Sequence, residues 1–112
     1  MTEARLAAAV EASALMRQVA ADGGFATILA RGDAERGVLL LIIIERGRNV
    51  AVLERMLNAQ GQYSWSRGSR EMDGPALAEW LQKRRRNDSD LWLIELDVPD
   101  AERFIAETTL KG

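Results

Sequence analysis

The sequence predicts an α+β fold, with a roughly five-stranded, mostly antiparallel sheet and about three helices. Two observations support this prediction. Short segments rich in β-branched and large apolar residues follow one another between turns that contain Gly or Asn, as strands do. Segments at both ends of the chain and before the last strand instead repeat their apolar residues at helical spacing. Together these patterns predict a single domain over residues 1–112, with the element order α-β-β-β-β-α-β-α.

The first helix is expected over residues 4–21. An apolar stripe recurs there at intervals of three and four residues, which places its members on one face of a helix. Gly23 and Gly24 supply the stop signal after it. The stripe consists of Ala8, Ala12, Leu15, Met16 and Val19.

Four strands are expected to follow. The second contains the run VLLLIII, which is apolar on both faces and therefore belongs at the centre of a sheet. The first and third are also two-faced, whereas the fourth alternates aromatic residues with serines, as a half-exposed strand does. Because the connections are short, these four strands are expected to form one antiparallel meander. Their expected spans are residues 25–31, 38–46, 50–57 and 62–67.

A second helix is expected from Pro75 to the basic run at residues 83–86, where cations favour the negative end of the helix dipole. The fifth strand, over residues 91–97, is reached through this helix. It is therefore expected to lie parallel to a neighbouring strand. Pro99 begins the last helix, whose first turn is acidic.

The composition excludes several classes of site. The chain has 112 residues, a formal net charge of −2, no His and no Cys. It therefore has no disulfide, thiolate nucleophile, Ser–His–Asp triad or imidazole base. Its longest apolar run, residues 38–44, is far shorter than the roughly 20 residues of a membrane helix. The N-terminal segment also lacks the basic-then-apolar order of a signal peptide. We expect a cytoplasmic protein with no cofactor and no membrane contact.

Three stretches carry a family resemblance: GGFATILARGDAERGVLLLIII, the helix ending in RRR, and NDSDLWLIELD followed by ERFIAE. They look like the bacterial family catalogued as domain of unknown function 1491, over roughly residues 10–107. Where that family favours an aromatic residue and a proline in the acidic loop, this chain has Asn87 and Ser89. The resemblance implies a small, single-domain cytoplasmic protein of bacterial origin without an assigned activity. It brings no catalytic residues.

A basic and aromatic patch is the first candidate binding surface. Cations that neutralise phosphates, beside rings that stack on bases, are what nucleic acid binding needs. Binding of nucleic acid or of a phosphate ligand is therefore the alternative function, although the acidic net charge of the whole chain disfavours it. The candidate residues are Tyr63, Trp65, Arg67, Arg70, Arg84, Arg85 and Arg86.

An acidic surface follows the basic patch in the sequence. Carboxylates bind Mg²⁺ and Ca²⁺, so a metal-dependent hydrolase is the weaker alternative. Residues 88–90 lack the glycine and the distal glutamate of an EF-hand loop, however, and no residue is assigned as a metal ligand. The acidic candidates are Asp88, Asp90, Glu95 and Asp97.

The favoured hypothesis is a non-enzymatic protein-interaction module that homodimerises. Strands that are apolar on both faces need cover, and three short helices are expected to leave part of the sheet bare. A symmetric dimer would bury that part. The Arg-rich and acidic segments carry opposite charges and can pair within one chain or between two chains. We therefore expect a protein partner or a second copy rather than nucleic acid.

Overall fold

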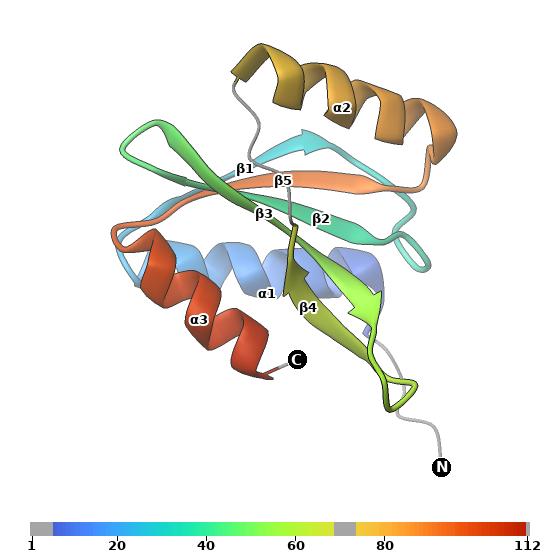
Figure 1. Ribbon diagram of the computed structural model, residues 1–112, viewed down its shortest axis with the longest axis horizontal. Helices are drawn as coiled ribbons and strands as arrows, with labels where there is room; N and C mark the ends of the chain where they lie inside the picture. The colour runs from blue at the N-terminus through green and yellow to red at the C-terminus, as the bar shows by residue number, and fades with distance from the viewer. Residues whose placement is uncertain (1–5, 69–73, 112) are drawn as a thin grey trace.

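The computed structural model describes residues 6–68 and 74–111. Its elements are α1 (Ala8–Ala21), β1 (Phe25–Ala30), β2 (Leu39–Glu45), β3 (Arg48–Leu57), β4 (Tyr63–Arg67), α2 (Gly74–Asn87), β5 (Trp92–Asp97) and α3 (Ala101–Lys111). The strands form one sheet, with α1 and α3 on one face and α2 on the other (Figure 1). The predicted α+β class and element order are confirmed.

The strand order differs from the predicted meander. Along the sheet the order is β1-β5-β2-β3-β4, so β5 separates β1 from β2. β5 runs parallel to β2, as expected of a strand reached through a helix, and antiparallel to β1. The prediction of a four-stranded meander is therefore wrong, because only β2, β3 and β4 form one.

Burial explains why β5, and not β1, lies beside β2. The residues of β2 from Leu39 to Ile44 are all buried, and β5 is buried everywhere except at Glu95 and Asp97. In β1, by contrast, every second residue is exposed. Strands buried on both faces favour the interior of a sheet, where both of their edges are also hydrogen-bonded. The pairing of β5 with β2 completes this buried centre and leaves β1 at an edge.

The two faces of the sheet carry separate apolar cores. Leu41 packs in the core below α1 and α3, whereas its neighbour Leu40 packs in the core below α2, as the alternation of a strand requires. The predicted stripe on α1 is confirmed at Ala8, Ala12 and Val19, which are buried. None of the helices in the described part of the chain is long and apolar enough to cross a membrane.

The loop between β1 and β2 closes over the start of β5. Gly32 and Gly37 have no space for a side chain, because the carbonyl group of Asp90 and the ring of Trp92 occupy the place of a Cβ atom. The Trp92 Nε1 group donates a hydrogen bond to the carbonyl oxygen of Asp33 at 2.8 Å. The backbone N–H of Asp33 in turn donates to the carbonyl oxygen of Asp90 at 3.0 Å. These contacts hold the loop that follows β1 in a fixed place.

Candidate functional site

The outer edge of β1 carries an exposed apolar row. The sequence of the strand, FATILA, contains no charged residue and no proline. Phe25 is 75% exposed and Leu29 is 49% exposed, and Thr27 between them is also exposed. One side of β1 pairs with β5, and no strand among residues 6–68 and 74–111 pairs with the other side. The backbone N–H and C=O groups on that side therefore face away from the sheet, as at any edge strand.

Phe25 and Thr27 of this row lie on the same face of the sheet as α2. Phe25 pairs with Asp97 of β5, and Thr27 pairs with Glu95. Directly paired residues share a face, and Ile94, which alternates with the two carboxylates, packs in the core on the other face. The exposed row is therefore bordered by the half-buried side chains of Glu95 and Asp97.

Charged residues lie at both ends of β1. Asp22 lies exposed at the C-terminus of α1, just before the strand, and Asp97 pairs with the first residue of the strand. Arg31 follows the strand directly, with its guanidinium 5.6 Å from the centre of the Trp92 ring. Arg85 of α2 reaches the same end, where its Nη2 donates a hydrogen bond to the Arg31 carbonyl oxygen at 2.6 Å. Asp22 and Asp97 thus lie at one end of β1 and Arg31 and Arg85 at the other, with Arg103 close to Asp22 and the exposed Asp33 two residues after Arg31.

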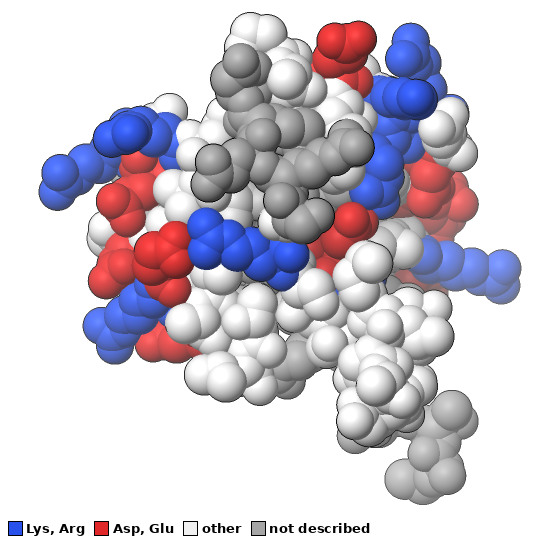
Figure 2. Space-filling view, in the orientation of Figure 1, with Lys and Arg blue, Asp and Glu red and all other residues white. Residues whose placement is uncertain are grey.

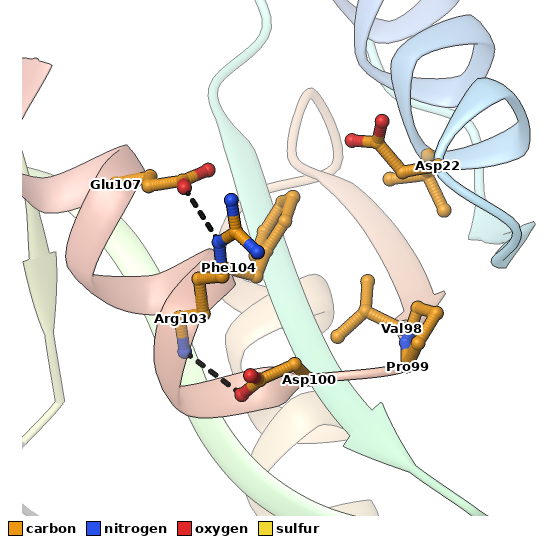
Figure 3. Close-up of a pocket in the computed structure, with 8 residues that line it drawn as sticks. Asp22, Val98, Pro99, Asp100, Arg103, Phe104 and Glu107 are labelled. Carbon is orange, nitrogen blue, oxygen red and sulfur yellow. Dashed lines mark hydrogen bonds and ion pairs between the residues drawn. The ribbon is translucent and has the colours of Figure 1, made fainter.

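A pocket of about 290 Å³ opens at the Asp22 end of β1, between the end of α1 and the start of α3 (Figure 3). The Nε of Arg103 donates to Glu107 at 3.0 Å, and the backbone N–H of Arg103 donates to Asp100 at 3.2 Å. The hydrogen bond to Glu107, helped by the charges of Glu107, Asp100 and Asp22, raises the pKa of the Arg103 guanidinium. These charged side chains are exposed. The pocket therefore offers a charged rim without a buried polar group.

The predicted basic and aromatic patch begins on β4, where its two rings differ. Trp65 is only 7% exposed and packs in the core below α1 and α3, with the guanidinium of Arg55 4.5 Å from the centre of its ring. Tyr63 is 64% exposed. Arg67 binds Glu102 of α3 at 3.0 Å. Trp65 is therefore a core residue, and the charge of Arg67 is paired with a carboxylate of the last helix within one chain.

The other arginines of the patch lie on α2, on the opposite face of the sheet. Arg84 binds Glu54 of β3 with 2.9 Å between Nη2 and Oε2. Arg85 lies at the Arg31 end of β1, and Arg86 is exposed. Arg70 lies outside the described residues. The structure thus separates the β4 and α2 arginines, and Figure 2 shows basic and acidic side chains interspersed rather than one basic field.

The predicted acidic surface is divided as well. Asp88 and Asp90 lie in the loop before β5, where a carboxylate oxygen of Asp88 accepts the backbone N–H of Asp90 at 3.0 Å. Glu95 and Asp97 lie farther along β5, beside the exposed row of β1. Within the described ranges, no three Asp or Glu side chains gather closely enough to hold a metal ion. The structure therefore brings together Glu95 and Asp97, and not all four candidates.

The exposed row on β1 is the part of the site that the sequence did not locate. The sequence predicts that part of the two-faced strands stays bare but not which part, and the structure leaves Phe25 and Leu29 exposed. The sequence carries no signal for the open face, because Thr27 is the only polar residue of FATILA and polar residues do not alternate with apolar ones.

Comparison with known proteins finds the same fold among proteins without an assigned activity. Residues 6–106 match the family described as "Protein of unknown function (DUF1491)", which confirms the resemblance. A crystal structure and an NMR structure of a DUF1491 family protein from Caulobacter crescentus CB15 are both 26% identical to this chain, with TM-scores of 0.78 and 0.76. These matches cover 87% and 88% of this chain and 92% and 91% of that protein. The solution structure of protein Atu0922 from A. tumefaciens is also 26% identical, with a TM-score of 0.71, and covers 87% of this chain and 89% of that one. No curated protein matches the chain.

Proposed function

The chain belongs to the DUF1491 family of proteins of unknown function, and from this premise we propose that it is a non-enzymatic protein-interaction module. Its contact surface is the outer edge of β1. Its mode of contact is strand addition, in which an extended segment of a partner pairs with that edge. The observation that supports this most is the charge-free edge strand with Phe25 75% exposed. We place the protein in the bacterial cytoplasm, because the chain has no Cys and its structural relatives are bacterial.

An uncovered apolar edge strand is suited to pairing with another strand. Proteins that stay monomeric blunt their edges with charged residues, prolines, bulges or a covering element. β1 has neither a charge nor a proline, and its pairing with β5 is regular from Phe25 to Ile28. The register shift comes only between Ile28 and Ala30. In strand addition the backbone groups of such an edge supply affinity, while the exposed side chains select the partner.

The two alternatives receive less support from the arrangement of the residues. Arg67 and Arg84 each bind a carboxylate, which offsets the charge that a phosphate would meet. Nucleic acid binding stays a prediction. It requires an affinity that falls steeply with salt and is lost when Arg84, Arg85 and Arg86 are all replaced by Ala. The metal-dependent hydrolase requires stabilisation by millimolar Mg²⁺, Mn²⁺ or Ca²⁺, and an unchanged melting temperature would contradict it.

Site-specific photo-crosslinking in cells tests the proposed contact surface. A photoreactive phenylalanine analogue replaces Phe25 in one variant and Tyr63, the exposed aromatic residue of the other edge strand, in the control. We expect covalent adducts from position 25 but not from position 63, with the crosslinked peptide mapping to an extended segment of the partner. Absence of adducts at position 25, or equal yields at both positions, would contradict the proposal.

A further inference from the structure

The outer edge of β1 is complementary to itself. We infer that it pairs antiparallel with β1 of a second copy of this chain, around a two-fold axis that passes between the two Thr27 residues. This inference rests on the proposed function, and it names the partner that strand addition takes. The pairing joins the two sheets into one continuous sheet across the dimer.

The exposed side chains set the register of this pairing. When Thr27 lies opposite Thr27, Phe25 of each copy lies opposite Leu29 of the other, because antiparallel partners are equally far from the axis. Directly opposite residues share a face, with Cβ atoms about 4.5–5.5 Å apart. The two large exposed apolar residues of the strand therefore come next to each other, once on each side of the axis. Regular pairing with β5 extends from Phe25 to Ile28, and Leu29 follows it at the register shift.

The charges nearest to the strand, Asp22 before it and Arg31 after it, favour the antiparallel direction. Antiparallel pairing sets the end of each β1 that has Asp22 and Asp97 against the end of the other that has Arg31 and Arg85. Parallel pairing would instead set acid against acid and base against base, and like charges across an interface suppress association.

The alternative contact between copies, β1 against β4, would join two different surfaces of the chain. A contact between two different surfaces is heterologous and, unless its rotation closes a ring, continues into a filament. The two-fold contact uses one surface twice and stops at a dimer. β4 is also occupied on its own chain, because Arg67 at its end binds Glu102 of α3.

Disulfide trapping tests the register directly, because the chain contains no Cys. In the proposed dimer the two Thr27 Cα atoms lie about 4.5–5.5 Å apart, within the range of about 4.4–6.8 Å that a disulfide spans. We expect Thr27→Cys to form a covalent dimer rapidly under mild oxidation. A Thr27→Cys variant that stays monomeric on a non-reducing gel would overturn the inference.

Two further cysteine variants separate this register from random collision. The two copies of Phe25 lie four residues out of register, about 14 Å along the strand, so Phe25→Cys alone is expected to crosslink poorly. The double variant Phe25→Cys with Leu29→Cys places unlike positions opposite each other and is expected to crosslink readily. Equal rates for Phe25→Cys and Thr27→Cys would contradict the two-fold axis at Thr27.

A charge placed on the axis tests the contact without oxidation. Thr27→Lys sets two ammonium groups opposite each other in the dimer, which is destabilising, while in one chain the new Lys lies beside Glu95. Native mass spectrometry is expected to show a dimer for the original chain and for the control Tyr63→Lys, and a monomer for Thr27→Lys with an unchanged circular dichroism spectrum. A dimer that persists in Thr27→Lys would overturn the inference.

A charge exchange tests the two ends of the strand. Arg31→Glu and Asp22→Arg are each expected to weaken dimerisation by about tenfold or more, with a weaker effect at high salt. The double variant exchanges the two charges and is expected to recover most of the affinity. Additive losses in the double variant would contradict the proposed facing of Arg31 and Asp22.

The proposed function and this inference fail in different ways. A photo-crosslinked adduct of twice the chain mass from position 25 supports both. An adduct with a different protein, together with a monomeric native mass at every concentration, supports strand addition and overturns self-pairing. Absence of both the adduct and the dimer overturns the two together.

Discussion

The two edges of the sheet differ in how they are protected. At one edge, β4 has only five residues, and α3 packs against it. Its central side chain, Trp65, is buried, and Arg67 at its end binds Glu102. At the other edge, β1 is free of charge along its length and exposes Phe25 and Leu29. Figure 1 shows β1 next to β5 at the far side of the sheet from β4.

The difference indicates which edge is suited to a partner. Natural sheets avoid edge-to-edge association by keeping edge strands short, charged or covered, as β4 is. β1 is one residue longer than β4, carries no charge from Phe25 to Ala30, and its side chains Phe25 and Leu29 are left uncovered. The fold therefore covers one edge within the chain and leaves the side chains of the other exposed.

The largest expected effect compares how much Trp65 of β4 and Phe25 of β1 contribute to the free energy of unfolding. Trp65→Ala is expected to lower the free energy of unfolding by about 3–5 kcal/mol, because it empties a buried site. Phe25→Ala is expected to change it by no more than about 0.5 kcal/mol, because an exposed ring loses few contacts. Urea unfolding followed by circular dichroism, with both changes made in the Thr27→Lys background, measures the difference.

That background matters because dimerisation would otherwise add to the apparent stability. In the dimeric chain Phe25→Ala is expected to reduce the dependence of the melting temperature on protein concentration. A large loss of stability from Phe25→Ala in the Thr27→Lys background would break the comparison, since it would mean that Phe25 packs against its own chain.

A smaller effect compares the ion pairs on the two faces of the sheet. Arg84 binds both carboxylate oxygens of Glu54, at 3.3 and 2.9 Å, and lies over the Trp80 ring at 5.2 Å. The pair is half-buried, so Arg84→Ala is expected to cost about 1–2 kcal/mol, between the values for surface and buried pairs. Arg67→Ala breaks the more exposed pair beside β4 and is expected to cost about 0–1 kcal/mol.

The same urea experiment at low and high salt separates these two pairs. The loss from Arg67→Ala is expected to disappear in 1 M salt, since screening acts on exposed charges. The loss from Arg84→Ala is expected to persist in part, because Arg84 also stacks on Trp80. Equal losses of unfolding free energy for Arg67→Ala and Arg84→Ala at both salt concentrations would contradict this difference. They would mean that the exposed pair of Arg67 stabilises the fold as much as the half-buried pair of Arg84.

Local pattern predicted the elements well, because each element is determined by its own side chains. The run VLLLIII marks β2 as a central strand, and β2 is buried throughout Leu39–Ile44. The alternation of Trp92, Ile94 and Leu96 places β5 with one face in the core below α1 and α3. Both patterns repeat with the period of the backbone itself and need no knowledge of distant neighbours.

Neighbour relations were not predictable in the same way. The pairing of Phe25 with Asp97 joins residues that are far apart in the sequence. The alternation of side chains along either strand is compatible with several neighbouring strands. The position of β1 at an edge, and therefore the exposed row, follows only from that pairing. Similarly, Arg67 and Arg84 are close in sequence but lie on opposite faces, because β4 and α2 contribute to different cores.

The smallest effect concerns the loops that flank the two edges. After β1, a carboxylate oxygen of Asp33 accepts the backbone N–H groups of Glu35 at 2.9 Å and Arg36 at 2.7 Å. Before β4, an amide oxygen of Asn58 accepts two backbone N–H groups of its own turn in the same manner. In both loops one side-chain oxygen accepts two backbone N–H groups, and the loops differ in whether the accepting side chain ionises.

This difference predicts a pH dependence at the β1 side alone. The hydrogen bonds from the backbone of Arg36 and Glu35 lower the pKa of Asp33 below its ordinary value of 3.8. The stability that this carboxylate contributes is therefore complete above pH 3.8 and is lost as the pH falls through the lower folded-state pKa. An NMR titration of the Asp33 carboxyl carbon is expected to show a midpoint below 3.8, accompanied by shifts of the Glu35 and Arg36 amides that Asp33→Asn abolishes. A midpoint at or above 3.8 would contradict the hydrogen bonds, and amide shifts of equal size around Asn58 would remove the distinction between the two loops.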